Sequence, residues 1–145
     1  MTSPPRILVI IGSESDRPVM EKGVALLQER GFEVEFIVSS AHRDPENTAS
    51  LAVDAEARGF SIVICGAGLS AGLAGVVAAH TELPVIGVPI SAGTLGGLDA
   101  LLATVQLPSG VPVATVGIDN AKNAAILAAR ILRLAGHPGR GRERG

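Results

Sequence analysis

The chain has 145 residues, of which 47% are hydrophobic, with a mean hydropathy of +0.41 and a formal net charge of −2. It contains no Tyr or Trp and no excess of basic residues, which argues against nucleic-acid binding. No apolar stretch approaches the roughly 20 residues that span a bilayer, and strand-like sequence begins at once, so neither a membrane anchor nor a signal peptide is expected. A cytoplasmic location is predicted. The single cysteine, Cys65, excludes an internal disulfide and is expected to be a buried thiol.

Short apolar runs alternate with longer segments of helical periodicity along the whole chain. The runs predict strands at residues 7–11, 34–38, 62–65, 85–88 and 112–116. The segments between them predict helices at residues 16–31, 44–59, 70–79, 94–105 and 120–134. Asp16 and Asp44 are expected to cap the first two helices, with Pro45 at the first helical position of the second.

This alternation predicts an α/β fold, a three-layer flavodoxin-like arrangement with a doubly wound parallel five-stranded sheet in the order 2-1-3-4-5. Residues 1–135 are expected to form a single catalytic domain. Residues 136–145 contain charges, Gly and Pro, and are predicted to be a disordered tail. The aliphatic composition suits strands buried on both faces, and it suggests that further apolar surface is buried between subunits. In the fourth helix an apolar stripe recurs at helical spacing: Leu95, Leu98, Leu101, Leu102 and Val105.

The loop after the first predicted strand reads Gly12-Ser13-Glu14-Ser15-Asp16. Gly12 permits close backbone approach, and the two serine hydroxyls can bond phosphate or ribose oxygens near a helix N-terminus. Asp16 would repel a phosphate, so it either accepts bonds from sugar hydroxyls or serves only as a helix cap. The segment is neither a GxGxxG fingerprint nor a P-loop, so dinucleotide and nucleoside triphosphate binding gain no support.

The loop after the second predicted strand carries Ser40, His42 and Arg43. Imidazole titrates near neutrality and can both give and take a proton, while a guanidinium can hold a phosphate or carboxylate through two bonds. The alternative is a solvated surface pair without a role in chemistry. No HxxxH, CxxC or carboxylate cluster points to a metal site.

Two further loops are rich in small residues. Residues 66–72 follow the third predicted strand and would let a flat ligand lie against Ala67 and Gly68, with Ser70 at the helix start. Tight packing between helix and sheet explains the same composition equally well. Residues 91–97 form a flexible loop that could close over a ligand or meet a neighbouring subunit.

From residue 6 to residue 134 the sequence resembles one family, the catalytic subunit of phosphoribosylaminoimidazole carboxylase. Its bacterial members are N5-carboxyaminoimidazole ribonucleotide mutases. The resemblance rests on motifs in the family's order: Gly12-Ser13-Glu14-Ser15-Asp16, Val38-Ser39-Ser40-Ala41-His42-Arg43-Asp44-Pro45, Gly66-Ala67-Gly68, Val88-Pro89, Gly97-Leu98-Asp99, Val105-Gln106-Leu107-Pro108, Gly110-Val111-Pro112-Val113-Ala114-Thr115-Val116 and Asn120-Ala121-Lys122-Asn123-Ala124.

The resemblance implies a homo-octamer with sites at subunit contacts, a ribonucleotide substrate, and neither metal nor organic cofactor. It implies that the substrate's carboxylate leaves the exocyclic nitrogen as CO2, which the ring carbon then takes up. His42 matches the family's proton-transfer residue. The expected substrate-binding residues are Gly12, Ser13, Asp16, Ser40, Arg43, Ala67, Gly68 and Ser70.

The glycine loop departs from the usual mutase sequence, GAGGAAHLPG. Gly72 replaces its His and Ala74 its Pro. Related carboxylases that use CO2 directly have Gly at this position, in AGRSNGLGP, but Leu69 and Ala71 stand where they have Arg and Asn. Three hypotheses therefore stay open: a mutase in purine biosynthesis, a direct carboxylase of aminoimidazole ribonucleotide, and a non-catalytic nucleotide-binding regulatory domain.

Overall fold

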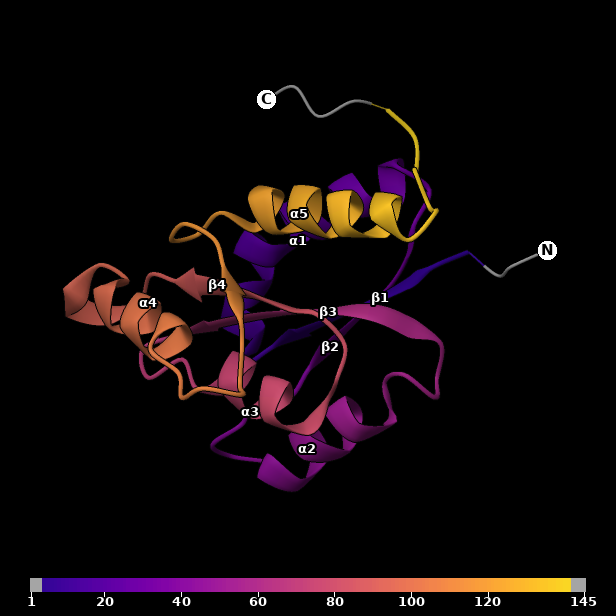
Figure 1. Ribbon diagram of the computed structural model, residues 1–145. Coiled ribbons are helices and arrows are strands. Elements are labelled where there is room, and N and C mark those ends of the chain that lie inside the picture. Colours follow the sequence, from indigo (N-terminus) through magenta and orange to yellow (C-terminus); the bar gives the residue numbers. More distant parts are fainter. Residues whose placement is uncertain (1–3, 142–145) are drawn as a thin grey trace.

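The computed structural model describes residues 4–141, whose strands form one parallel sheet in the order β2-β1-β3-β4-β5 (Figure 1). The predicted fold class and strand order are confirmed. The strands are β1 (Arg6–Ile11), β2 (Glu33–Val38), β3 (Phe60–Gly68), β4 (Val85–Ile90) and β5 (Ala114–Thr115). The α-helices are α1 (Arg17–Glu29), α2 (Pro45–Asp54), α3 (Leu73–His80), α4 (Leu98–Val105) and α5 (Ala121–Leu134), with short 3-10 helices η1 (Glu14–Asp16) and η2 (Gly93–Leu95).

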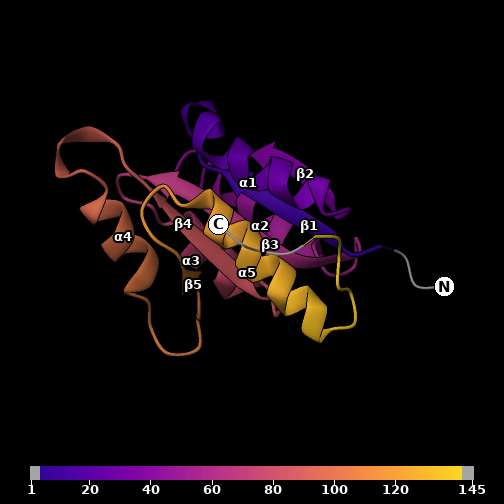
Figure 2. The ribbon, with the colours of Figure 1, turned by 90° about the horizontal axis from the view of Figure 1, so that it is seen from above.

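Helices cover both faces of the sheet, because alternate strand residues point to opposite sides. Ile7, Val9 and Ile11 of β1 pack in the layer formed by α1 and α5, while Leu8 and Ile10 pack in the layer formed by α2 and α3. Figures 1 and 2 show the sheet between these two helix pairs. The central strands are therefore buried on both faces, as their aliphatic sequence predicts.

The contact between α1 and α5 depends on small residues. A Cβ at Gly23 would lie 2.6 Å from the carbonyl oxygen of Ala121, so only glycine permits this approach. Helix α5 turns alanines toward the sheet and α1, and its buried residues are Ala121, Ala124, Ala125, Ala128, Ala129 and Leu132. This close packing holds α1, and the loop that leads into it, firmly against the sheet.

Several element boundaries differ from the sequence-based prediction. The third strand runs to Gly68 instead of ending at Cys65, so Gly66, Ala67 and Gly68 pair with β4 and do not form a loop. Residue 66 is glycine for a steric reason, because a Cβ there would lie 2.6 Å from the Met20 sulfur of α1. Glycine here serves the tight packing of helix on sheet.

The predicted strand at residues 112–116 is also too long, because β5 pairs with β4 only through Ala114 and Thr115. Pro112 has no N–H to donate to such a ladder. The third and fourth helices begin later than predicted, at Leu73 and Leu98, because turns with left-handed residues precede each of them.

The predicted cap at Asp16 is wrong, whereas that at Asp44 is confirmed. Asp16 has helical dihedrals and its side chain makes no capping bond, because η1 precedes α1 and turns this carboxylate away from the helix end. Ser13 caps η1 instead, accepting a bond from the backbone N–H of Ser15. The Asp44 side chain accepts a bond from the backbone N–H of Asn47, and Pro45 begins α2.

Helix α4 packs on β4 through Ala100 and Thr104, both of which are buried. Most of its predicted apolar stripe faces outward instead. The exposed fractions are 62% for Leu95, 53% for Leu98, 48% for Leu102 and 48% for Val105. The structure thus has an apolar surface beside the carboxyl ends of the strands.

The two ends of the described chain meet at the opposite edge of the sheet, where the strands begin (Figure 1). Pro5 and Arg140 line the same hollow, and the backbone N–H of Arg140 donates to the carbonyl of Arg30 at 3.0 Å. The predicted disordered tail stays a prediction, since residues 142–145 lie outside the described residues. None of the helices within residues 4–141 combines the length and apolar character needed to cross a membrane.

Candidate active site

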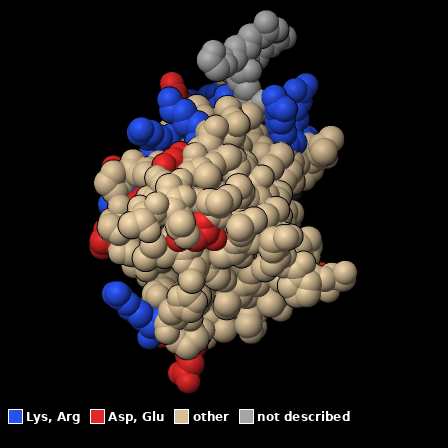
Figure 3. Space-filling model, turned by 90° about the vertical axis from the view of Figure 1, so that its left-hand side faces the viewer, with Lys and Arg blue, Asp and Glu red and all other residues tan. Residues whose placement is uncertain are grey.

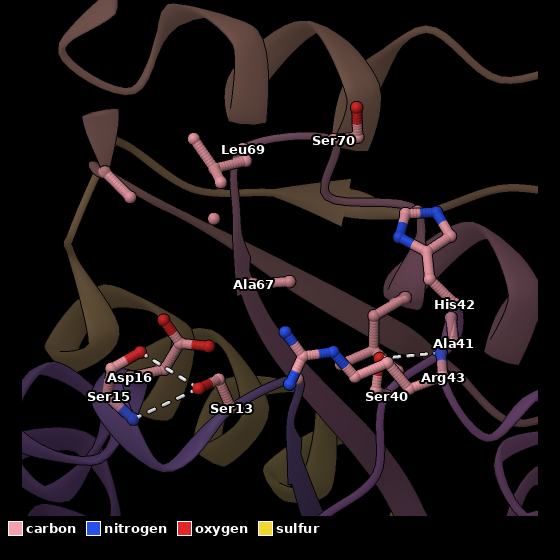
Figure 4. A pocket seen from close by; sticks show the side chains of 15 residues that line it. Ser13, Ser15, Asp16, Ser40, Ala41, His42, Arg43, Ala67, Leu69 and Ser70 are labelled. Carbon is pink, nitrogen blue, oxygen red and sulfur yellow. Dashed lines mark hydrogen bonds between the residues drawn. The ribbon is translucent and has the colours of Figure 1, made fainter. Parts of the chain in front are cut away.

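A cavity of about 430 Å³ opens at the carboxyl ends of β1, β2 and β3, where the strand order reverses (Figure 4). All of the predicted site residues line it. They are Gly12, Ser13, Asp16, Ser40, His42, Arg43, Ala67, Gly68 and Ser70. The three loops therefore converge as the strand order predicts. The roles of these residues stay predictions.

The loop between β1 and α1 supplies hydroxyls and one carboxylate. The Ser13 hydroxyl accepts bonds from the backbone N–H of Ser15 at 3.3 Å and from the Ser15 hydroxyl at 3.0 Å. Asp16 is buried, and this burial raises the pKa of its carboxyl group, while a hydrogen bond with the Ser13 backbone acts in the opposite direction. The loop thus presents polar groups whose orientation is fixed by short-range bonds.

The loop between β2 and α2 brings His42 and Arg43 to the cavity, and both side chains are exposed to solvent. In Figure 4 the guanidinium of Arg43 extends toward Ser13, and the His42 ring lies on the Ser70 side of the cavity. The Ser40 hydroxyl accepts a bond from the backbone N–H of Arg43 at 3.1 Å. Ser40 therefore shapes the turn from which both functional side chains project.

A buried chain of hydrogen bonds anchors this loop to α2. The amide nitrogen of Asn47 donates to the Ser39 hydroxyl at 2.9 Å, and the hydroxyls of Ser39 and Thr48 lie 2.7 Å apart. The Thr48 hydroxyl donates to the carbonyl of Asp44 at 3.1 Å. Ser39 and Thr48 are both buried, so these bonds are shielded from water and hold the loop at both of its ends.

The end of β3 forms the floor and one wall of the cavity. Leu69 adopts a left-handed backbone with φ of +52°, and its side chain is 54% exposed at the rim. Ser70 lines the cavity, but Figure 4 shows its hydroxyl pointing away from His42 and Arg43. Gly72 borders His42 closely, since a Cβ on Gly72 would lie 3.5 Å from the His42 Nε2 atom.

The charges and donors of the cavity suit an anionic polar ligand. Arg43 supplies a cation, Ser13 and Ser15 supply hydroxyls, and α3 begins beside the cavity without a side-chain cap. His42 adds an imidazole, whose ring nitrogens can donate or accept hydrogen bonds. Across residues 4–141, no three His, Cys, Asp or Glu side chains gather as a metal site would require.

Sequence reasoning left some lining residues out of the predicted site: Ser15, Ala41, Leu69, Gly72, Leu73 and Ala92. Ser15 lies within the same motif as Ser13, so the sequence offered a signal that it also lines the cavity. Leu69 and Ala92 carry no chemical signal in the sequence. Their place depends on a left-handed turn and on the path of the loop after β4, which only the folded chain reveals.

The fold and the cavity define an α/β protein with a polar cavity, lined by His42 and Arg43, at the switch point of a doubly wound sheet. Comparison with known proteins identifies the family within this class. A family model described as AIR carboxylase matches residues 6–140. The chain belongs to this family.

Named relatives and a solved structure agree with this membership. The chain is 54% identical over 128 residues to the N5-carboxyaminoimidazole ribonucleotide mutase of Thermotoga maritima, covering 88% of this chain and 75% of that protein. It is 51% identical over 137 residues to the phosphoribosylaminoimidazole carboxylase of Ogataea methanolica, covering 94% of this chain and 25% of that protein. The crystal structure of Treponema denticola PurE matches with a TM-score of 0.81 at 33% identity, covering 90% of this chain and 81% of that one.

Proposed function

We propose that the protein is an N5-carboxyaminoimidazole ribonucleotide mutase, an isomerase of purine biosynthesis. The observation that carries the proposal is the meeting of His42, Arg43, Ser13 and Asp16 in one cavity, in a chain 54% identical to a mutase. The proposal takes residues 1–135 as one catalytic domain. It places the protein in the cytoplasm.

In the proposed reaction, a carboxylate moves from the exocyclic nitrogen of the substrate to a ring carbon. The bond between nitrogen and the carboxyl carbon breaks to release CO2, and the nitrogen takes up a proton. The ring carbon then attacks the CO2 and loses its own proton. His42 gives the first proton and removes the second, so it returns to its starting state and no net proton is consumed.

The binding groups are assigned by charge. Arg43 holds the phosphate or carboxylate of the substrate through charge-assisted bonds, and Ser13 donates to the same oxygens. Asp16 accepts bonds from ribose hydroxyls. The backbone at Ala67 and Gly68 provides a flat surface against which the imidazole ring of the substrate lies, because neither residue projects a large side chain.

The deciding experiment supplies purified protein with N5-carboxyaminoimidazole ribonucleotide and follows formation of the 4-carboxy isomer. We expect turnover without added metal or cofactor, and the same rate after treatment with a chelator. A folded protein that turns over neither this substrate nor aminoimidazole ribonucleotide with CO2 would be a non-catalytic nucleotide-binding domain, and the proposal would fail.

Direct carboxylation of aminoimidazole ribonucleotide is the second candidate. Gly72 favours it, because the family's mutases have His here while its CO2-using members have Gly, and a side chain at this position would contact His42, since a Cβ would lie 3.5 Å from the His42 Nε2 atom. Relatives named as carboxylases are also about as similar to this chain as those named as mutases. Turnover of aminoimidazole ribonucleotide with dissolved CO2, faster than that of the carboxylated substrate, would support this candidate over the mutase.

We also propose that the chain forms a homo-oligomer, in keeping with the octamer that the resemblance implies. The support is the outward-facing apolar surface formed by Leu95 of η2 together with Leu98, Leu102 and Val105 of α4. Figure 3 shows the side on which α4 lies, where uncharged surface surrounds an acidic patch near the centre of the face. Contact with further copies of the same chain would cover this surface beside the cavity.

A further inference from the structure

Two residues have a backbone that side chains normally avoid, and both touch the loop that follows β4. Within residues 4–141, the non-glycine residues with positive φ are Leu69, at +52°, and Asp119, at +61°. Such conformations cost about 1 kcal/mol or more and persist where surrounding contacts hold them in place. Leu69 lies at the cavity rim, whereas Asp119 lies in the loop between β5 and α5.

Asp119 ties its own loop to the end of β4 through both carboxylate oxygens. Its Oδ1 accepts a bond from the backbone N–H of Ser91 at 2.8 Å, and its Oδ2 accepts one from the Ser91 hydroxyl at 2.5 Å. The backbone N–H of Asp119 donates to the carbonyl of Pro89 at 2.8 Å. These bonds join two loops that are separated by a helix in the sequence.

A second contact fixes the far end of the same loop. Gly97 has φ of +93°, and a Cβ there would lie 2.6 Å from Ile118 and 3.2 Å from the Cα of Ser91. Both ends of the 91–96 segment are therefore held against the loop that carries Asp119.

The middle of the 91–96 segment lies against the cavity wall. Ala92 lines the cavity, and a Cβ at Gly68 would lie 3.2 Å from the Ala92 side chain. A Cβ at Gly93 would lie 3.0 Å from the Cδ2 atom of Leu69. Together with Leu73, the side chains of Leu69 and Ala92 are among the apolar groups lining the cavity.

We propose that Asp119 is a positioning residue that retains CO2: it holds the 91–96 segment so that Ala92 and Leu69 close the apolar side of the cavity. This inference rests on the proposed function. CO2 is small and carries no net charge, so no ion pair can hold it between its release and its capture. An immobile apolar wall retains it, and a loose wall lets it escape to leave decarboxylated aminoimidazole ribonucleotide.

The test compares Asp119→Gly with Asp119→Asn and Ser91→Ala. Glycine accepts the left-handed backbone, so Asp119→Gly removes the carboxylate without adding strain. Asparagine also tolerates this conformation and can keep both contacts, accepting from the Ser91 N–H and donating to its hydroxyl. Ser91→Ala removes one bond of the pair. Asp54→Ala, at an exposed carboxylate ending α2, is the matched control.

The readout is the share of N5-carboxyaminoimidazole ribonucleotide that ends as aminoimidazole ribonucleotide instead of the 4-carboxy product, in buffer free of bicarbonate and corrected for the reaction without enzyme. We expect this share to rise several-fold in Asp119→Gly, to rise less in Ser91→Ala, and to stay at the wild-type value in Asp119→Asn and Asp54→Ala.

An unchanged share in Asp119→Gly, with only a lower melting temperature, would show a purely structural role and overturn the inference. If Asp119→Gly does not fold, an unchanged share in Ser91→Ala overturns it equally. Absence of turnover in the wild-type protein would instead reject the proposed function, so the two failures are distinguishable.

Discussion

In the proposed reaction one side chain delivers a proton and removes another, and this role is assigned to His42. We expect His42→Asn to lower kcat by about 10²-fold or more, because asparagine keeps hydrogen bonds but does not exchange protons. The KM should change little, since the proposed anchors Arg43 and Ser13 remain. Steady-state kinetics measures both constants, and calorimetric binding of the product checks that the site is intact. A near-normal rate would mean that water or His80 of another subunit moves the proton.

The buried carboxylate of Asp16 lowers the stability of the fold when it is charged, and we propose that it binds the ribose of the substrate. Burial raises the pKa of its carboxyl group, so the folded state binds the proton more tightly than the unfolded state. The associated stability is fully present below the unfolded pKa and is lost as the pH rises through the folded pKa. Above this window the buried carboxylate is charged and costs stability.

Asp16→Asn should therefore raise the free energy of unfolding at neutral pH, and the difference from wild type should shrink on acidification. The same change should raise KM by about tenfold, as expected when a charged acceptor of hydrogen bonds is lost. Urea unfolding at several pH values, together with steady-state kinetics, measures both effects. A variant that is less stable than wild type at neutral pH would contradict the role of burial.

The polar lining residues and the small residues Gly12, Ala67 and Gly68 were accessible from sequence, whereas the apolar lining residues Leu69 and Ala92 were not. Ser13, Asp16, His42 and Arg43 follow predicted strands, and parallel strands must bring their carboxyl ends together. Leu69 reaches the rim through a left-handed turn that no pattern of apolar and polar residues encodes. The Ser70 hydroxyl points away from His42 and Arg43 for the same reason, because Ser70 directly follows the left-handed residue Leu69.

At the scale of elements, the junction of β2 and α2 positions the loop that carries His42 and Arg43. We expect Thr48→Val to lower stability by about 1–3 kcal/mol, because the buried Ser39 hydroxyl loses one of its two hydrogen-bond partners and the Asp44 carbonyl loses one of its donors. It should also lower kcat, since the loop bearing His42 loses an anchor. Thr48→Ser is the matched control, because it keeps the hydroxyl. Chemical unfolding and kinetics of the folded variants test this, and an unchanged kcat in Thr48→Val would separate the anchor from catalysis.

The order and type of elements follow from the repeating strand and helix pattern, but their ends depend on contacts across the fold. The glycines of residues 66–68 were interpreted as a loop, yet Gly66 is required by Met20 of α1 and pairs within the sheet. In α4, helical spacing correctly indicated a helix but did not tell which face is buried. Ala100 and Thr104 pack on the sheet, and the larger leucines face outward.

At the scale of the whole molecule, the exposed apolar face of α4 is the surface through which we propose that copies of the chain associate. We expect Leu102→Glu to weaken the oligomer, because a charge would be placed in a contact that buries apolar surface. Leu134→Glu is the control, since Leu134 is 91% exposed at the end of α5. Sedimentation velocity with activity measurements follows both variants. A wild-type protein that sediments as a monomer of 14.7 kDa at micromolar concentration would contradict the proposed assembly.

The neighbouring positions of Pro5 and Arg140, at the edge of the sheet away from the cavity, bear on how this unit can be combined with others. A partner polypeptide fused at either end would begin on the side opposite to the entrance. In the carboxylase of Ogataea methanolica, the region that matches this chain makes up only a quarter of a longer protein. Adjacent ends also suit circular permutation and domain insertion. We therefore expect that residues 5–140 can be inserted into a loop of a host protein without blocking the entrance of the cavity.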